Sequence, residues 1–258
     1  MRPKKSYGQH FLKNDHTAAR IVAALQRAIE VGHVLEVGPG MGILTRHLLA
    51  RSEQYVTYAV EADADMVDYL RKHLPQLGTR LIRGDFLAFN PTAIWGDQPF
   101  CLIGNFPYNI STQILFWVLN FRGSIPEVVG MFQKEVADRI AATPGTRIYG
   151  ITSVLVQAYY NVEMLFTLER GAFEPPPTVR SAVIRLTRKD GFELQCREET
   201  FRRLVKTAFN QRRKMLRNTL KEFFPAEQLY RDAFFEKRPE MLSWTDFEQL
   251  GVWYEANK

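Results

Sequence analysis

Apolar residues in the first half of the chain follow an order that predicts alternating helices and strands. Four short apolar runs have the length of buried strands: residues 34–37, 55–60, 80–82 and 100–103. Between and beside them, apolar residues at helical spacing predict helices over residues 18–29, around 44–49, and over 64–74 and 111–119. Strands that alternate with helices in this way predict an α/β fold built on a parallel sheet.

The pattern changes character near Arg188. Before it, residues 128–132, 162–168 and 182–186 are predicted strands, and residues 151–159 form a predicted helix. After it, apolar stripes predict helices over 201–209 and 215–220, with short helices around 227–234 and 245–254. We therefore predict one domain over residues 1–188, which includes an N-terminal arm of residues 1–14, and a helical domain over residues 189–258.

A glycine-rich turn follows the first predicted strand. Gly38, Gly40 and Gly42 come directly after the apolar run, and a helix follows. Glycines in such a turn let the backbone approach a ligand closely. A dinucleotide fingerprint needs a third glycine where Ile43 stands, so S-adenosylmethionine (SAM) is a better candidate ligand than NAD.

Polar side chains also stand at the ends of the next three strands. Glu61 comes 23 residues after Gly38, which is suitable for holding ribose hydroxyls. Asp85 would accept a hydrogen bond from an adenine amine, and Asn105 ends the fourth strand. A single acid at a strand end is usually a capping or solvated residue, but an ordered set of this kind favours one ligand site at the sheet edge.

The four residues Asn-Phe-Pro-Tyr at 105–108 suit chemistry on an exocyclic amine. Such an amine is a poor nucleophile, because its lone pair is delocalised into the ring. The Asn105 side chain and a main-chain carbonyl near Pro107 would accept its two N–H groups, and Tyr108 would stack on the base. Taken alone, these four residues are better interpreted as a Pro-Tyr turn that caps a strand.

Phe173 precedes three consecutive prolines at 175–177, which form a stiff, extended segment. Phe173 would then be presented toward the mouth of the sheet. A core phenylalanine beside a linker is an equally good interpretation of the same spacing.

Charge is distributed unevenly along the 258 residues, whose net charge is +6. Residues 201–221 contain eight cations and no acid: Arg202, Arg203, Lys206, Arg212, Arg213, Lys214, Arg217 and Lys221. A basic helical face is often only a solvated surface. Eight cations without an acid favour contact with nucleic-acid phosphates instead.

Other classes of protein are not indicated. The two cysteines, Cys101 and Cys196, lie far apart, so neither a disulfide framework nor a zinc site is expected. The N-terminus lacks a hydrophobic signal core, and no apolar run approaches the length of a membrane span. We expect a cytoplasmic protein.

Eight motifs, taken in order, resemble those of the KsgA-type ribosomal RNA adenine dimethyltransferases. They are QHFL at 9–12, EVGPGMG at 36–42, EAD at 61–63, GDF at 84–86, NFPYNIS at 105–111, FQKE at 132–135, PPPTVRS at 175–181 and QRRK at 211–214. The chain departs from the family pattern at His10, Phe106 and Thr178, where Asn, Leu and Lys are common. The first departure bears on the arm's contact with the cofactor and the second on the shape of the pocket.

The resemblance implies a Rossmann-like SAM-dependent methyltransferase domain and a small helical, RNA-binding C-terminal domain. The implied reaction is N6,N6-dimethylation of two adjacent adenines in the hairpin near the 3′ end of small-subunit rRNA, late in subunit assembly. No metal is implied, and we expect a monomer whose partners are this rRNA and the immature 30S subunit.

The resemblance also implies roles for single residues. His10, Leu12, Gly38, Glu61, Asp85 and Asn105 would bind the cofactor. Asn105 and the Pro107 carbonyl would orient the target amine, with Tyr108 and Phe173 on the two faces of the base. Two alternatives stay open: a resistance enzyme that modifies large-subunit rRNA, and an assembly factor for which methylation is secondary.

Overall fold

The computed structural model describes residues 8–257 and divides the chain into two compact units. Unit 1 contains the described residues of Met1–Ala137 together with Asn161–Arg188, and unit 2 contains Asp138–Tyr160 and the chain from Lys189 onward. The last boundary between the two units falls after Arg188, where the sequence pattern also changes. Unit 2 additionally contains a stretch from the middle of the chain. The functional division into two domains stays a prediction, and the first seven residues of the arm lie outside the described part.

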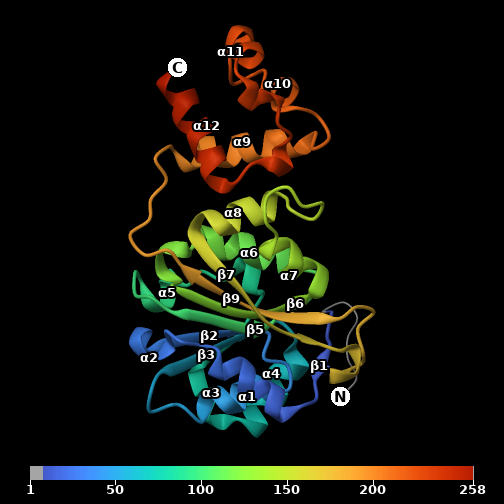
Figure 1. Cartoon of the computed structure of the whole chain (residues 1–258). Helices are drawn as coiled ribbons and strands as arrows, with labels where there is room; N and C mark the ends of the chain where they lie inside the picture. Colours follow the sequence, from blue (N-terminus) through green and yellow to red (C-terminus); the bar gives the residue numbers. More distant parts are fainter. Residues whose placement is uncertain (1–7, 258) are drawn as a thin grey trace. The chain divides into compact units, whose positions relative to one another are not determined.

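A seven-stranded sheet forms the centre of unit 1 (Figure 1). Its strands, in spatial order, are β4 (Leu81–Arg83), β3 (Val56–Glu61), β2 (His33–Val37), β5 (Cys101–Asn105), β6 (Glu127–Gln133), β9 (Ser181–Arg188) and β7 (Tyr160–Leu168). The first five are parallel, and β9 runs antiparallel to β6. The predicted α/β fold with a mostly parallel sheet is confirmed.

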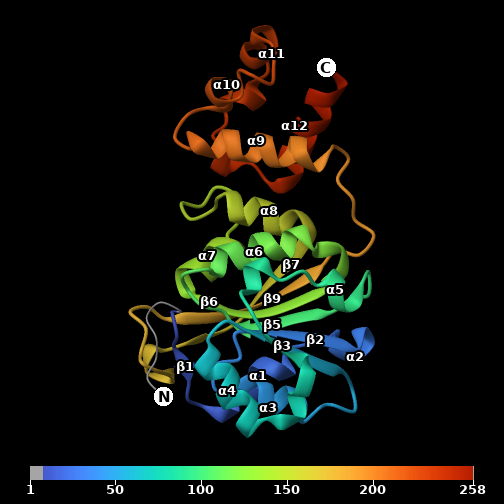
Figure 2. The ribbon, with the colours of Figure 1, turned by 180° about the vertical axis from the view of Figure 1, so that it is seen from behind.

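Helices cover the two faces of this sheet (Figures 1 and 2). One face carries α1 (Asp15–Ala23), α3 (Ile43–Leu49) and α4 (Ala64–His73), and the other carries α6 (Ser111–Asn120). Parallel strands buried on both faces are apolar along their whole length, which explains the continuous apolar runs in the sequence. An acid within such a strand is therefore unusual.

The first helix differs from its prediction. Instead of one helix over residues 18–29, α1 ends at Ala23 and a short α2 covers Ala28–Val31. Between them, the main-chain N–H groups of Gln26 and Arg27 donate to the carboxylate of Glu127 over 2.9–3.0 Å. Glu127 is fully buried, so these bonds satisfy its carboxyl oxygens and interrupt the helix at this point. Local spacing gives no sign of an acceptor a hundred residues away.

A second, two-stranded sheet was not predicted. β1 (Phe11–Leu12) pairs antiparallel with β8 (Phe173–Glu174), placing Leu12 opposite Phe173. The Phe173 side chain has no exposed surface and packs in the core that contains Leu12 and Ile21. The structure therefore corrects the expectation that Phe173 faces the mouth of the sheet: pairing with the arm turns its ring inward, where an apolar side chain is most stable.

Unit 2 is helical. Its longer helices are α8 (Ile151–Tyr159), α9 (Glu198–Asn210) and α12 (Trp244–Ala256), with short α10 (Leu216–Thr219) and α11 (Ala226–Arg231) between the last two. Its largest fully buried side chains are aromatic: Tyr149, Tyr160, Phe201, Phe235 and Phe247. α7 (Lys134–Ala141) follows β6 and crosses from one unit into the other. No helix within residues 8–257 has the length and hydropathy needed to span a membrane.

Candidate active site

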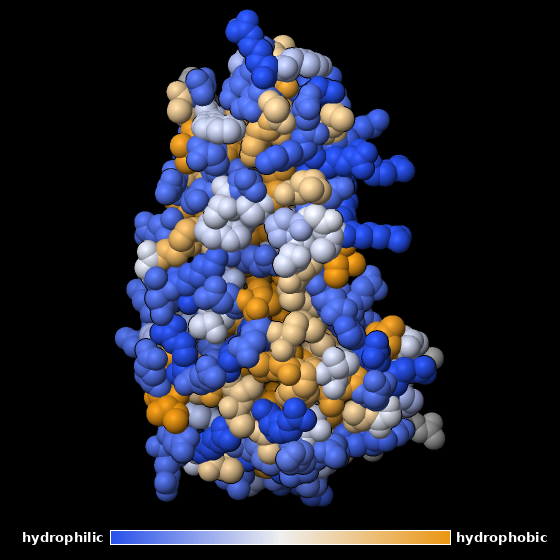
Figure 3. Space-filling model, viewed as in Figure 1, coloured by the Kyte–Doolittle hydropathy of each residue, from blue (hydrophilic) through white to orange (hydrophobic). Residues whose placement is uncertain are grey.

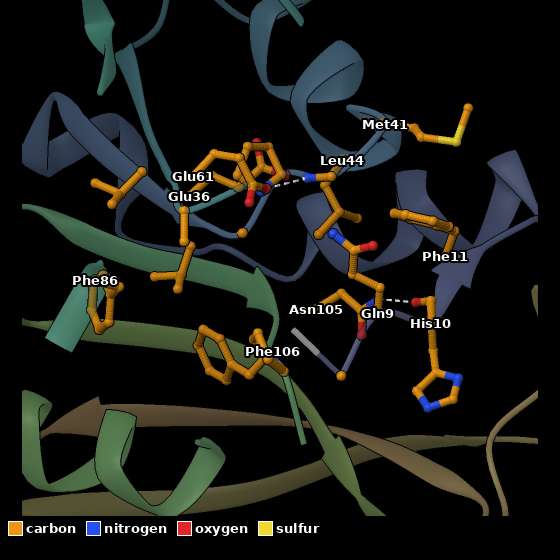
Figure 4. A pocket seen from close by; sticks show the side chains of 18 of the residues that line it. Gln9, His10, Phe11, Glu36, Met41, Leu44, Glu61, Phe86, Asn105 and Phe106 are labelled. Atoms are coloured by element: carbon orange, nitrogen blue, oxygen red, sulfur yellow. Dashed lines mark hydrogen bonds between the residues drawn. The ribbon is translucent and has the colours of Figure 1, made fainter. Parts of the chain in front are cut away.

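A cavity of about 900 Å³ opens at the carboxyl ends of β2, β3, β4 and β5 (Figure 4). The strand order reverses here, with β3 on one side of β2 and β5 on the other. Open α/β sheets bind ligands at such a reversal, because loops from neighbouring strands separate there. The volume is typical of sites for small ligands and cofactors.

The structure brings nearly all the candidate ligand residues of unit 1 to this cavity. Gly38, Glu61, Asp85 and Asn105 line it from successive strand ends, and His10, Leu12, Pro107 and Tyr108 complete the set. Phe173 is the one that does not line it. The roles of these residues in binding and catalysis remain predictions.

Two glycines of the turn after β2 leave parts of the cavity wall without side chains. Gly38 and Gly40 have φ angles of +63° and +54°, which other residues adopt only with strain. A Cβ atom on Gly40 would also lie 2.9 Å from the Phe11 ring. Phe11 of the arm therefore rests directly on the turn, and any larger residue at position 40 would displace it.

Two buried acids, Glu36 and Glu61, lie side by side at the cavity (Figure 4). Neither forms an ion pair with a cation in the described part of the chain. Burial is the main cause that raises the pKa of Glu36 to about 8, with the negative charge of Glu61 adding to it and the Thr45 hydroxyl, which donates over 2.6 Å, opposing it. A cavity with this lining is suited to a ligand that carries positive charge.

Glu36 was missed as a functional candidate, although it lies within one of the motifs. The available signal was an acid within the apolar run of β2, at a position where both sheet faces are covered.

Glu61 is held rigidly by the backbone. Its Oε2 accepts from the Gly40 N–H at 3.0 Å and its Oε1 from the Asp63 N–H at 2.9 Å. Burial raises the pKa of Glu61 despite these bonds. Each carboxylate oxygen has a further lone pair, so the group can still accept from the hydroxyls of a ligand.

The arm is tied to the cavity by its polar groups. Gln9 Nε2 donates to Asp63 at 2.9 Å. Asn105 Nδ2 donates to the His10 main-chain oxygen at 2.8 Å (Figure 4). Because a carbonyl only accepts, the second bond fixes which end of the Asn105 amide faces the arm. The Asn105 Oδ1 atom has no donor among residues 8–257 and is left to accept from a ligand.

Phe106, one of the departures from the family pattern, is fully buried beneath the site. Its ring packs against Phe132 with centroids 5.1 Å apart. A Cβ atom on Gly130 would lie 2.2 Å from the same ring. Gly130 on β6 thus leaves room in the core for the bulkier side chain at position 106, which also lines the cavity.

Pro107 and Tyr108 follow at the cavity's edge. The Pro107 carbonyl accepts from the Ile110 N–H at 3.2 Å, which leaves one lone pair. The half-buried Tyr108 ring lies beside the imidazole of His10, with centroids 5.3 Å apart, and its hydroxyl is hydrogen-bonded to Ser181. Burial raises the pKa of Tyr108, so the phenol stays neutral.

Asp85 is exposed at the far side of the cavity. Its Oδ1 accepts from the Leu87 N–H at 2.9 Å and so caps a short 3₁₀ helix, Phe86–Ala88. The other oxygen is free to accept from a ligand. Phe86 also lines the cavity, although its ring is buried against Trp117.

The eight cations of residues 201–221 fall into two groups within unit 2. Arg202, Arg203, Arg212 and Arg217 lie within ion-pair distance of Glu198, Glu222, Glu240 and Glu236 respectively. Lys206, Arg213, Lys214 and Lys221 are exposed, and within residues 8–257 no acid pairs with them. Four of the eight cations thus have carboxylate partners, which residues before and after 201–221 supply.

The four unpaired cations lie on α9 and on the segment after it. Long hydrophilic side chains project from this part of unit 2 (Figure 3).

Comparison with known proteins gives a consistent result. Residues 1–238 match the family model described as ribosomal RNA adenine dimethylase. A ribosomal RNA small subunit methyltransferase A from Flavobacterium johnsoniae is 47% identical over 257 residues, covering 100% of this chain and 97% of the relative. The protein of the same name from Cytophaga hutchinsonii is 49% identical over 250 residues, covering 97% and 96%.

Solved structures share the fold. A dimethyladenosine transferase from Plasmodium falciparum superposes with a TM-score of 0.79 at 24% identity, covering 96% of this chain and 98% of the other. The 23S rRNA methyltransferase ErmE has a TM-score of 0.69 at 24% identity, covering 94% and 99%.

Proposed function

The chain belongs to the ribosomal RNA adenine dimethylase family, and on that premise we propose that it uses SAM to dimethylate N6 of two adjacent adenines of small-subunit rRNA. The target is the hairpin near the 3′ end, modified late in subunit assembly. The observation that best supports this proposal is the convergence of Gly38, Glu61, Asp85 and Asn105 on one cavity.

The lining of the cavity fits the cofactor. Glu61 would hold the ribose hydroxyls, Asp85 the adenine amine, and the side-chain-free turn at Gly38 would lie against the methionine part. The carboxyl groups of Glu36 and Glu61 have no ion-pair partner among residues 8–257, so a positively charged ligand would stabilise their ionised forms. The chemistry supplied by the bound cofactor is an activated methyl group on a positively charged sulfur.

Asn105 and Pro107 would orient the target amine. The Asn105 Oδ1 atom and the second lone pair of the Pro107 carbonyl would each accept one N–H, which favours a pyramidal nitrogen whose lone pair is available. Tyr108 would stack on one face of the base. With Phe173 in the core, the second stacking contact proposed for it is not supported by the structure.

Catalysis in this arrangement depends on positioning. The donor arrives already activated, so the side chains supply orientation and electrostatic stabilisation in a covered site. The adenine must leave its helix to reach the cavity.

Unit 2 would bind the surrounding RNA backbone. The cations best placed for phosphate contact are the unpaired ones, Lys206, Arg213, Lys214 and Lys221. We further propose that the substrate is the immature 30S subunit, that the chain acts as a monomer, and that it works in the cytoplasm, where subunits are assembled.

Mass spectrometry of rRNA tests the proposal. Small-subunit particles from cells lacking this chain, incubated with the purified protein and SAM, should gain N6,N6-dimethyladenine at two neighbouring positions. Replacing Asn105 with Ala should lower the rate by about 100-fold or more, as removal of an oriented polar group in other active sites does. Small-subunit particles that gain no dimethyladenine, or a wild-type rate for Asn105→Ala, would overturn the assignment.

A further inference from the structure

The segment of residues 175–181 contacts two rings at the cavity. At one end, the Pro175 carbonyl lies 2.8 Å from His10 Nδ1, which must therefore donate. At the other end, the Ser181 hydroxyl is hydrogen-bonded to the Tyr108 hydroxyl. The two rings lie beside each other at an interplanar angle of 31°. One segment thus holds both rings although Phe173, just before it, faces away.

Ser181 is a rigid anchor for Tyr108. It is the first residue of β9, has no exposed surface, and lies opposite Gln133 in the antiparallel ladder with β6. The preceding residue is fixed as well, because the Arg180 carbonyl accepts from the Lys134 N–H at 2.9 Å. The serine hydroxyl is therefore positioned by the sheet and not by a loop.

The Ser181 hydroxyl is a polar group in apolar surroundings. The next three residues, Ala182, Val183 and Ile184, are apolar and fully buried. A buried hydroxyl is unfavourable unless it is hydrogen-bonded, and within the described residues its partner is Tyr108. The pair joins positions 73 residues apart, one in the sheet core and the other at the cavity.

Resting on the function proposed above, we propose that Ser181 is a positioning residue that fixes the tilt of the Tyr108 ring and matters most for the second methyl transfer. An unmethylated amine has two N–H groups, which Asn105 and the Pro107 carbonyl can both hold. A monomethylated amine has one, so one of these hydrogen bonds is lost. The stacking ring then carries a larger share of the orientation.

The test compares Ser181→Ala with Tyr108→Phe, which removes only the phenol hydroxyl and keeps the ring. Single-turnover reactions on unmethylated small-subunit particles, followed by mass spectrometry, give separate rates for the first and second transfer. Both variants should slow the second transfer by about three- to tenfold, the effect of one neutral hydrogen bond, and accumulate monomethyladenine. In Ser181→Ala, the first transfer should change by less than about twofold.

The double variant distinguishes positioning from a general loss of stability. If the two hydroxyls act through each other, the double variant should be no slower than the more impaired single variant. Calorimetric SAM affinity should stay unchanged in all three. Thr178→Ala, an exposed position on the same segment, is the matched control and should behave as wild type.

Two results would overturn the inference: a wild-type ratio of monomethyl to dimethyl product in Tyr108→Phe, or additive losses in the double variant. Failure of the proposed function itself looks different, because the wild-type protein would then give neither methylated adenine.

Discussion

The cavity of unit 1 and the basic surface of unit 2 are built in opposite ways. At the cavity, polar groups are buried or half-buried and most have partners far away in the sequence, as in Asn105 with His10 and Tyr108 with Ser181. On unit 2, the cations lie at the surface, and several form ion pairs with acids that are also exposed to solvent. Buried hydrogen bonds fix geometry, whereas exposed charges set affinity and its salt dependence. Substitutions in the two regions should therefore give different kinds of effect.

The largest expected effect concerns Glu36. Because its pKa is raised from 4.5 to about 8 in the folded chain, the folded state binds a proton that the unfolded state has already lost. The free energy of unfolding should therefore fall as pH rises from about 4.5 to 8, by an amount on the order of 3 kcal/mol by pH 7. Glu36→Gln keeps an acceptor for Thr45 and cannot ionise, so its stability should be higher at pH 7 and flatter with pH.

Urea unfolding at pH 5, 7 and 9 measures this difference. Glu53→Gln, at an exposed acid, is the matched control and should follow the wild-type curve. If Glu36→Gln shows the wild-type dependence on pH, the Glu36 carboxyl is not the group that makes the free energy of unfolding fall as pH rises.

The next effect in size tests the cofactor assignment of Asp85. Replacing Asp85 with Ala removes the side-chain acceptor for the adenine amine and should weaken SAM binding by about 10- to 100-fold. Asp85→Asn retains an oxygen that can accept from the Leu87 N–H or from a ligand. This variant should therefore lose less SAM affinity than Asp85→Ala. Isothermal titration calorimetry gives both affinities, and rRNA affinity should not change. An unaltered SAM affinity in Asp85→Ala would defeat the assignment.

The cavity could be predicted from sequence because its residues stand at the ends of parallel strands. Once the strands ending at Val37, Glu61 and Asn105 are recognised, the geometry of a parallel sheet brings those ends to one edge. No knowledge of side-chain packing is needed for that step. The glycine turn was similarly local, since its backbone conformation depends on residues adjacent in the chain.

Apart from Glu36, the features that the sequence left open or did not predict depend on contacts between residues that are not neighbours in the chain. Phe173 turns inward because a two-residue strand pairs with the arm, and two residues are too few to give a periodic signal. The Tyr108 hydroxyl meets Ser181 only once β9 has joined β6. In unit 2, Glu222, Glu236 and Glu240 approach the basic segment through turns that a count of charges along the chain does not represent.

The smallest effects per residue are expected on unit 2, and they separate paired from unpaired cations. Replacing Lys206, Arg213, Lys214 and Lys221 together with Ala should lower rRNA affinity and reduce the slope of log K against log salt by up to about 3, since each phosphate contact contributes roughly 0.7–0.9. The matched quadruple variant replaces Arg202, Arg203, Arg212 and Arg217 with Ala. It removes the same total charge, but from arginines that form ion pairs with glutamates.

Those four arginines can contact phosphate only by breaking their ion pairs with carboxylates. Replacing the four arginines should therefore change the salt slope by less than half of the change expected for the variant that lacks the unpaired cations. Filter binding at four salt concentrations measures both slopes. Equal slopes for the two variants would mean that the surface carboxylates exchange freely with phosphate and that pairing in the free chain has no bearing on RNA contact. An unchanged slope in the first variant would leave the exposed cations of unit 2 as a solvated surface, with RNA bound elsewhere.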